Sequence, residues 1–255
     1  MAGTAPDPRA PGKGRAVRGM FASIAPRYDL LNRLLSAGQD QRWRKALVKR
    51  LPALSGGDRV LDLCTGTGDV ALAIASGPGM QATVHASDFC EAMVARAPAK
   101  AVRHRAARGG GAPVFLVADA LALPYADGRF RAVTVAFGLR NIEDPPAALA
   151  EIARVLQPGG RLLILEFSRP DNRAFARLYR FYFFEVLPRL GRLLSGSTID
   201  AYRYLPESVW AFPGPEALAA AMRVAGLAVV EQKRFLIGAV MLHVSERPAP
   251  AGRIP

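Results

Sequence analysis

The stretch that decides the fold is R-V-L-D-L-C-T-G-T-G-D-V-A-L-A-I-A-S, residues 59–76. It begins as a short apolar run of strand length, and residues 69–76 repeat apolar side chains at helical spacing. Between them, Gly66 and Gly68 let the backbone turn and pass close to a ligand, and the following helix starts with free N–H groups. The stretch predicts a strand, a glycine turn and a helix that together bind a nucleotide-like ligand. An ordinary turn between a strand and a helix is the competing interpretation.

Acidic residues follow at the spacing that a nucleoside ligand needs. Residues 83–87 predict a second strand that ends at Asp88, about 20 residues beyond the glycines, where a carboxylate can bind a ribose diol. A third strand, residues 114–117, is closed by Asp119 and Ala120. This spacing fits NAD and S-adenosylmethionine equally well.

Two features distinguish these cofactors. Asp62 lies inside the first strand, where a carboxylate is costly unless it serves the loop or the ligand. A Pro-Gly-Gly turn at 158–160 leads into a strand at 161–167. The series resembles the class I methyltransferases, in which the carboxylate after the second strand holds the ribose and the acidic residue after the third, with its neighbour, reaches the adenine. The resemblance implies an α/β, Rossmann-like sheet with helices on both faces and favours a methyltransferase over a dehydrogenase.

Length and composition set the domain organisation. At 255 residues with 51% hydrophobic content, the chain can form one large α/β domain with a substantial core. We expect a disordered basic tail at 1–16, one domain at 17–247 and a loose tail at 248–255. Within the domain, the aromatic and apolar residues of 17–52 predict helices that cover the cofactor as a lid. Plain packing against the sheet is the alternative.

The chain is strongly basic, with 34 Lys and Arg against 21 Asp and Glu and a net charge of +13. Such an excess suits an anionic partner, either nucleic acid or a phospholipid surface. The basic residues are spread along the chain without a recognisable nucleic-acid-binding module, so we expect peripheral membrane contact and no nucleic acid. The alternative is that the basic charge reflects only a composition rich in Arg and Ala and serves no partner.

The cysteines and the hydropathy pattern indicate where the protein works. Cys64 and Cys90 show no metal-ligand spacing, and the sequence predicts no metal site. No run reaches the roughly 18 apolar residues of a membrane-spanning helix, and the start of the chain lacks the apolar segment of a secretory signal. We expect a cytoplasmic protein that contacts the inner face of the cell membrane.

A second candidate site follows the predicted fourth strand, residues 130–137. The sequence G-L-R-N at 138–141 lies where ligands bind in open α/β sheets. Arg140 and Asn141 would be costly there as mere filling, which favours a role in the site over a helix-capping turn.

Five runs of the sequence together form a specific pattern. They are Y-D-L-L-N (28–32), L-D-L-C-T-G-T-G-D (61–69), F-G-L-R-N (137–141), R-V-L-Q-P-G-G-R-L-L-I-L-E-F (154–167) and Y-R-Y-L-P-E-S-V (202–209). With these runs the chain resembles the quinone-biosynthesis C-methyltransferases, which comprise the demethylmenaquinone and the polyprenyl-benzoquinol methyltransferases. The resemblance covers residues 17–247 and implies that Thr67, Asp88, Asp119 and Ala120 bind S-adenosylmethionine.

The implied substrate is a reduced prenylated quinol, because loss of a phenolic proton makes the adjacent ring carbon nucleophilic. We expect methylation of demethylmenaquinol to menaquinol, with a polyprenyl-methoxy-benzoquinol of ubiquinone biosynthesis as the alternative. Arg140 could stabilise the quinolate, Asn141 could orient its oxygen and Tyr28 could relay the proton. An RNA methyltransferase and a non-catalytic scaffold are alternatives from other classes.

The last third of the chain holds one unusual segment. Residues 171–191 combine aromatic and apolar side chains with arginines, which suits a helix that lies on a membrane or accepts an apolar substrate tail. A core helix or a helix that faces a second copy is the alternative, and a homo-oligomer therefore stays open. Residues 228–235 and 239–245 predict an antiparallel strand pair that closes the sheet.

Overall fold

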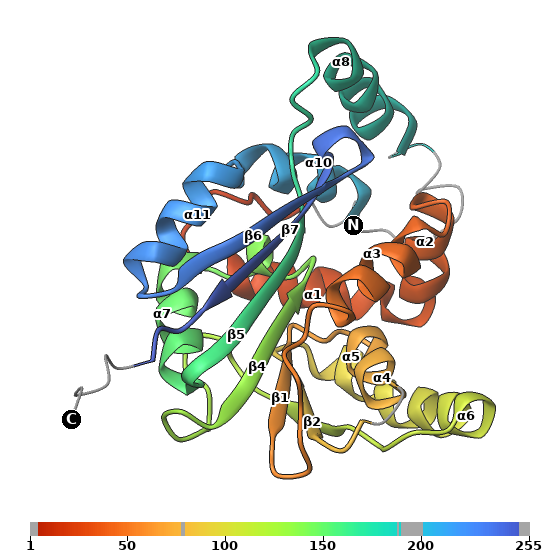
Figure 1. Ribbon diagram of the computed structural model, residues 1–255. Coiled ribbons are helices and arrows are strands. Elements are labelled where there is room, and N and C mark those ends of the chain that lie inside the picture. Colours follow the sequence, from red (N-terminus) through yellow and green to blue (C-terminus); the bar gives the residue numbers. More distant parts are fainter. Residues whose placement is uncertain (1–4, 78–79, 188, 190–200, 250–255) are drawn as a thin grey trace.

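The computed structural model describes residues 5–77, 80–187, 189 and 201–249 (Figure 1). Its centre is a seven-stranded sheet in the order β3-β2-β1-β4-β5-β7-β6. The first five strands in this order run parallel, and β7 runs antiparallel to both of its neighbours, β5 and β6. The strands are β1 (Arg59–Leu63), β2 (Thr83–Asp88), β3 (Val114–Val117), β4 (Phe130–Ala136), β5 (Leu156–Phe167), β6 (Ala228–Phe235) and β7 (Val240–Glu246).

The strand order reverses beside β1, which has β2 on one side and β4 on the other. The chain therefore leaves β1 and β4 in opposite directions, and a crevice opens beyond their carboxyl ends, where ligands bind in sheets of this kind. The glycine turn of the sequence prediction lies at this crevice, with Gly66 at φ +57° and Gly68 at φ +88°.

Helices cover both faces of the sheet (Figure 1). On one face, α7 (Pro145–Val155) and α11 (Pro215–Val224) bury their apolar sides against the strands. On the other, α3 (Gln39–Val48) and α4 (Asp69–Ala75) do the same, with Trp43 in the core. These layers and the antiparallel β6–β7 pair confirm the predicted fold class.

The region before β1 forms α1 (Lys13–Ile24), the short helix η1 (Ala25–Arg27), α2 (Tyr28–Leu35) and α3. Helix α1 begins at Lys13, earlier than the start of order predicted at Val17. The reason is a contact that composition could not reveal, because the Gly12 N–H donates to Glu143 Oε1 at 2.7 Å. The segment just before Val17 is therefore anchored on the domain.

One further boundary differs from the prediction, in β5. Before it, residues 91–108 form two helices, α5 (Glu91–Val94) and α6 (Ala97–Arg108), because Pro98 begins a new helix. Strand β5 begins at Leu156, before the Pro-Gly-Gly turn, and pairing with β4 then skips to Arg161. A Cβ on Gly160 would lie 2.7 Å from the Gln157 carbonyl oxygen, so this bulge needs a glycine.

Beyond β5, aromatic helices form a separate layer at the carboxyl end of the sheet (Figure 1). They are α8 (Arg173–Phe181), the π-helical turn η3 (Tyr182–Val186) and α10 (Ala201–Ala211). The Tyr179 ring lies 4.2 Å from Phe183 and 5.9 Å from Trp210, centroid to centroid. The prediction for residues 188 and 190–191 falls outside the described residues. No described helix has the length and apolarity needed to cross a bilayer.

Candidate active site

Two adjoining cavities lie at the carboxyl ends of the central strands. The polar cavity has a volume of about 310 Å³ and contains Gly66, Asp88, Asp119 and Ala120. The apolar cavity, about 510 Å³, lies between α1 to α3 and the aromatic helices α8 and α10. The residues that line both cavities mark the junction between them. They are Phe21, Tyr28, Cys64, Ala136 and Phe137.

Asp88 is fixed at the end of β2 by backbone donors. Its Oδ2 accepts a hydrogen bond from the Gly66 N–H at 2.8 Å, and its Oδ1 accepts one from the Cys90 N–H at 2.9 Å. Burial raises the pKa of this carboxyl, and the backbone hydrogen bonds oppose that rise. Each carboxylate oxygen keeps a further lone pair, so the group can still accept hydrogen bonds from a diol in the cavity.

Asp119 and Ala120 stand beside Asp88, because β2 and β3 are neighbours in the sheet. Asp119 Oδ1 accepts a hydrogen bond from the Leu121 N–H at 3.0 Å, which orients the carboxylate at the cavity. The structure thus brings the predicted residues Gly66, Asp88, Asp119 and Ala120 together in one cavity. Two carboxylates at adjacent strand ends fit the ribose and adenine of S-adenosylmethionine.

Two other predicted cofactor residues serve the turn itself. Gly68 lines neither cavity, and a Cβ there would lie 3.0 Å from Phe115 Cε1. Asp62 is 1% exposed and accepts hydrogen bonds from Thr65 Oγ1 at 2.5 Å, Thr134 Oγ1 at 2.7 Å and the Ala71 N–H at 3.1 Å. Burial raises its pKa to about 6 despite these donors. Asp62 therefore ties the turn to β4 and α4, although one side of it borders the apolar cavity.

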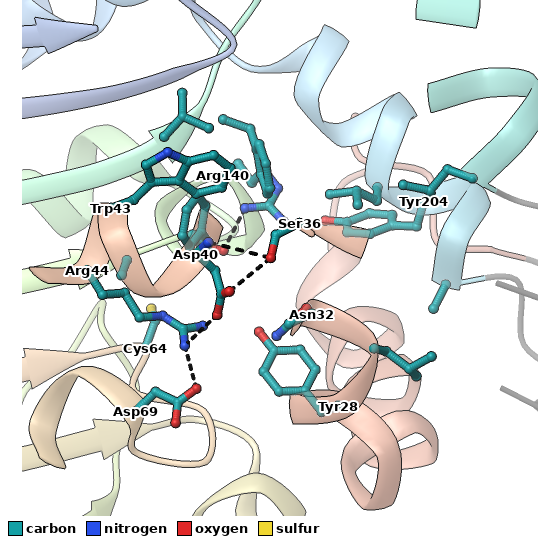
Figure 2. Close-up of a pocket in the computed structure, with 18 of the residues that line it drawn as sticks. Tyr28, Asn32, Ser36, Asp40, Trp43, Arg44, Cys64, Asp69, Arg140 and Tyr204 are labelled. Atoms are coloured by element: carbon teal, nitrogen blue, oxygen red, sulfur yellow. Dashed lines mark hydrogen bonds and ion pairs between the residues drawn. The ribbon is translucent and has the colours of Figure 1, made fainter. Parts of the chain in front are cut away.

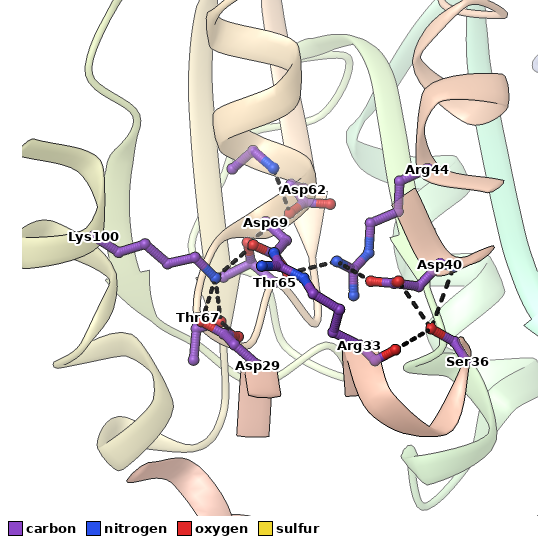
Figure 3. A network of polar contacts seen from close by, with 11 residues as sticks. Asp29, Arg33, Ser36, Asp40, Arg44, Asp62, Thr65, Thr67, Asp69 and Lys100 are labelled. Carbon is purple, nitrogen blue, oxygen red and sulfur yellow. Dashed lines mark hydrogen bonds and ion pairs between the residues drawn. The ribbon is translucent and has the colours of Figure 1, made fainter. Parts of the chain in front are cut away.

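Thr67 joins a network of charged side chains that closes over the start of α4 (Figure 3). Its Oγ1 donates to Asp29 Oδ1 of α2 at 2.5 Å. Lys100 of α6 contacts Asp29 Oδ2 at 2.6 Å and Asp69 Oδ1 at 2.5 Å, and Arg44 of α3 contacts Asp69 Oδ2 at 2.5 Å. Burial alone would raise the pKa of Asp69, but Arg44 and Lys100 hold it below its ordinary value.

This network connects the helices before β1 to the glycine turn. Asp29, Arg44 and Lys100 are site residues that the sequence analysis missed. Asp29 lies in the Y-D-L-L-N run and carried a signal, whereas Lys100 sits on an Arg- and Ala-rich helix without any. Among the described residues, no group of three or more His, Cys, Asp and Glu side chains could hold a metal ion.

Aromatic rings form much of the wall of the apolar cavity. Phe137 and Phe167 come from the ends of β4 and β5, with centroids 4.6 Å apart, and Phe175 comes from α8. Figure 2 shows Tyr28 and Asn32 of α2 across the cavity from Arg44 and Asp69. Such a wall suits a flat ring and a hydrocarbon tail.

Arg140 borders this cavity, and neighbouring protein groups hold its guanidinium in place. Its Nη1 contacts Glu166 Oε1 and the Phe137 carbonyl oxygen, both at 2.6 Å, and its Nε donates to Ser208 Oγ at 3.3 Å. Its guanidinium carbon lies 5.4 Å from the centroid of the Phe167 ring. No described residue hydrogen-bonds Nη2. Glu166, which is 2% exposed, was missed, although its place in an apolar strand is the same signal that singled out Asp62.

Asn141 and Arg140 line different cavities, although both side chains donate to the Phe137 carbonyl oxygen. Asn141 lines the polar cavity, its Nδ2 donates to the Phe137 carbonyl oxygen at 3.3 Å and its Oδ1 accepts from Tyr204 Oη at 3.1 Å. With both ends of its amide occupied by the protein, Asn141 is suited to fixing Phe137 and Tyr204 rather than to orienting a quinol oxygen.

Tyr28 lines both cavities and lies over the glycine turn. Its Cε1 would be 3.6 Å from a Cβ on Gly66. Burial raises the pKa of Tyr28, while a hydrogen bond with Asn32 acts in the opposite direction. The phenol is therefore protonated near neutral pH and suited to passing a proton on rather than to acting as a free base.

The junction between the cavities has a strained backbone. Cys64 at φ +56° and Phe137 at φ +58° are non-glycine residues in the left-handed region. They follow β1 and β4 directly, and a Cβ on Gly138 would lie 2.3 Å from Cys64 Cβ. Strain of this kind gathers at functional sites, where the surrounding structure holds it in place.

Comparisons with known proteins agree with this geometry. Residues 10–247 match the ubiE/COQ5 methyltransferase family. The chain is 53% identical to the demethylmenaquinone methyltransferase of Thermus thermophilus, with 90% of this chain and 100% of that relative covered. It is 45% identical to a ubiquinone/menaquinone biosynthesis C-methyltransferase of Geobacter sulfurreducens, over 92% of this chain and 90% of that relative.

A solved structure supports the fold. A SAM-dependent methyltransferase of Thermotoga maritima aligns with a TM-score of 0.63 at 18% identity, over 91% of this chain and 99% of that chain. The resemblance stated from the sequence, the methyltransferase class and S-adenosylmethionine as the cofactor are confirmed, and the roles of individual site residues stay predictions. The chain belongs to the ubiE/COQ5 methyltransferase family.

Proposed function

We propose that this protein transfers a methyl group from S-adenosylmethionine to a ring carbon of demethylmenaquinol, giving menaquinol. The observation that carries the proposal is the pair of adjoining cavities, one with carboxylates for a nucleoside and one with aromatic walls. Bound S-adenosylmethionine supplies an electrophilic methyl group on its sulfonium. The name of the Thermus thermophilus relative supports demethylmenaquinol as the substrate.

The residues at the junction have separate tasks in this proposal. Tyr28 and Phe137 hold the ring between the two cavities, and the helices before β1 exclude water from it. Arg140 stabilises the oxygen that is negative in the quinolate, because Nη2 is left over when Glu166 and the Phe137 carbonyl engage the other side of the guanidinium. Tyr28 passes the phenolic proton on, and Asn141 keeps Phe137 in position.

The test is methyl transfer from isotope-labelled S-adenosylmethionine to two chemically reduced substrates in parallel. One is demethylmenaquinol, and the other is a demethylated polyprenyl-benzoquinol. We expect kcat/KM to be higher with demethylmenaquinol and the label to appear on ring carbon. No transfer to demethylmenaquinol, with transfer to the benzoquinol, would assign the protein to the ubiquinone precursor instead. The oxidised quinone is the control and should accept no methyl group.

The place of action in this proposal is the inner, cytoplasmic face of the cell membrane. A prenylated quinol dissolves in the bilayer, and the net charge of +13 draws the protein to anionic phospholipid. The same charge does not call for nucleic acid, because the cavities suit a ring and an apolar tail.

A further inference from the structure

Exposed apolar side chains surround the opening of the apolar cavity. Leu178 of α8 and Leu236 of η4 (Leu236–Gly238) line this cavity and are still 63% and 49% exposed, so the cavity opens between them. Leu34 of α2, Phe181 of α8 and Ile237 of η4 are 52%, 58% and 60% exposed, and α2 also contributes to the wall of this cavity. These three line neither cavity, so binding of a substrate does not explain their exposure.

The loop η4 holds its apolar side chains outward at an energetic cost. Leu236 has φ +47° and Ile237 has φ +54°, a conformation in which glycine or asparagine would be less strained. The loop is attached to the segment before α8, because the Ser168 N–H donates to the Ala239 carbonyl at 2.9 Å and Arg234 contacts Asp171 at 3.5 Å. Strained backbone and exposed apolar surface coincide at one side of the opening.

Arginines lie beside these apolar side chains. Arg173, Arg177 and Arg180 are exposed and follow one another at helical spacing along α8, which contains no acidic residue. Like charges at this spacing repel each other unless an anion lies between them. Apolar side chains next to a row of arginines are the pattern of a helix at a membrane interface.

We propose that this rim docks on an anionic phospholipid bilayer. Leu34, Phe181 and Ile237 enter between the headgroups, and the α8 arginines pair with lipid phosphates. The opening of the apolar cavity then faces the hydrocarbon, so a prenyl tail reaches the cavity without crossing water. The reason for docking rests on the proposed function, whereas the docking itself can be measured without any methyl transfer.

The first experiment measures co-sedimentation of the full chain with phosphatidylcholine vesicles, with and without phosphatidylglycerol. Binding should require phosphatidylglycerol and weaken with salt. The double variant Phe181→Ser/Ile237→Ser should bind the vesicles with an affinity at least about tenfold lower, because two large apolar side chains are lost. Arg173→Gln/Arg177→Gln should lose about fivefold for each arginine.

Matched controls lie on α6, at a distance from α8 (Figure 1). Val102 is 71% exposed and Arg103 is exposed beside it, and neither lines the cavities. Val102→Ser and Arg103→Gln should bind vesicles like the wild type. Equal binding by Phe181→Ser/Ile237→Ser, or no binding by the wild type, would overturn the proposal.

Measurements of methyl transfer distinguish a failure of membrane docking from a failure of the proposed function. Phe181→Ser/Ile237→Ser should methylate a water-soluble, short-tailed demethylnaphthoquinol at the wild-type rate and lose activity only on the long-tailed quinol in vesicles. If the wild type does not methylate the soluble analogue, the proposed function fails while the vesicle result stands. Sedimentation velocity tests whether the rim binds a second copy of the chain instead of a bilayer. If the wild type is a dimer and Phe181→Ser/Ile237→Ser dissociates it, the rim is an interface between two copies and the docking proposal is wrong.

Discussion

The two cavities are built in different ways. The polar cavity uses strand ends, and backbone N–H groups at fixed positions hold its central carboxylate, Asp88. The apolar cavity also touches strand ends, but most of its wall comes from helices in distant parts of the chain, and Arg140 at its border is held by the side chain of Glu166. A site on strand ends can be found from local spacing, whereas a site enclosed by helices depends on tertiary packing.

The largest expected effect falls on the polar cavity. Asp88→Ala should remove two charge-assisted hydrogen bonds to the ribose, at about 1.5–3 kcal/mol each, and weaken S-adenosylmethionine binding accordingly. Titration calorimetry measures this loss, and the KM for the quinol at saturating cofactor should change little. Asp127→Ala is the control, because the side chain of Asp127 is 78% exposed and lies in neither cavity. Unchanged cofactor affinity in Asp88→Ala would remove Asp88 from the site.

Arg140→Ala tests the apolar cavity. Removal of a donor that strengthens in the transition state should lower kcat by roughly 10²-fold while S-adenosylmethionine affinity stays within a few-fold. Glu166 would be left as a buried, unpaired charge, which should lower the free energy of unfolding by about 3–5 kcal/mol. Kinetics therefore need conditions in which denaturation curves show the variant folded.

Arg140→Lys separates the two effects of that substitution. It keeps a cation beside Glu166 and should recover most of the stability, but it should recover only part of the rate because it lacks the planar fork. If Arg140→Ala loses cofactor binding and keeps its turnover at saturation, Arg140 belongs to the polar cavity.

The third prediction concerns Asp62, beneath the glycine turn. Burial raises its pKa from 3.8 to about 6, so its contribution to stability is complete below pH 3.8 and is lost as the pH rises through about 6. Relative to Asp62→Asn, the wild type should lose about 3 kcal/mol of unfolding free energy across this window. Urea denaturation of both proteins at several pH values measures the difference. If the difference in unfolding free energy between the two proteins does not vary with pH, the pKa of Asp62 is not raised in the folded protein.

The smallest effect concerns the network that connects the helices before β1 to the glycine turn. Asp29→Asn removes one charge from the contact with Lys100, and the Asp29 side chain is 38% exposed, so solvent screening limits the loss to about 1 kcal/mol. Because the network holds α2 over the turn, both the Kd for S-adenosylmethionine and the KM for the quinol should rise a few-fold. Glu246→Gln is the matched control, since Glu246 is also 38% exposed in its ion pair with Arg161. It should leave both constants unchanged, and equal effects of the two variants would contradict a role of the network in binding.

Local patterns predicted the strand ends well. The glycine turn, Asp88 and Asp119 were identified because each follows a short apolar strand, and the order of parallel strands then places them together. The same logic applies to Glu166 in β5, where the carboxylate in an apolar run was overlooked.

Other features depended on contacts that the sequence does not reveal. Lys100 reaches Asp29 across 71 residues of chain, and nothing near either residue indicates the pair. Asn141 was expected beside the quinol, but in the tight turn η2 (Leu139–Asn141) it lines the polar cavity while Arg140 lines the apolar one, and its amide is used by Phe137 and Tyr204. The early start of α1 depends on the contact between Gly12 and Glu143.

The most direct test of the division between the two cavities is a crystal structure of the ternary complex with S-adenosylhomocysteine and a demethylnaphthoquinol. We expect the ribose at Asp88, the adenine near Asp119, and the quinol ring in the apolar cavity beside Tyr28, Phe137 and Arg140. We also expect the sulfur to point at the ring across the junction. A ring that binds outside the apolar cavity, or a nucleoside that lies among the aromatic side chains of α8 and α10, would show that the two cavities do not divide the two ligands in this way.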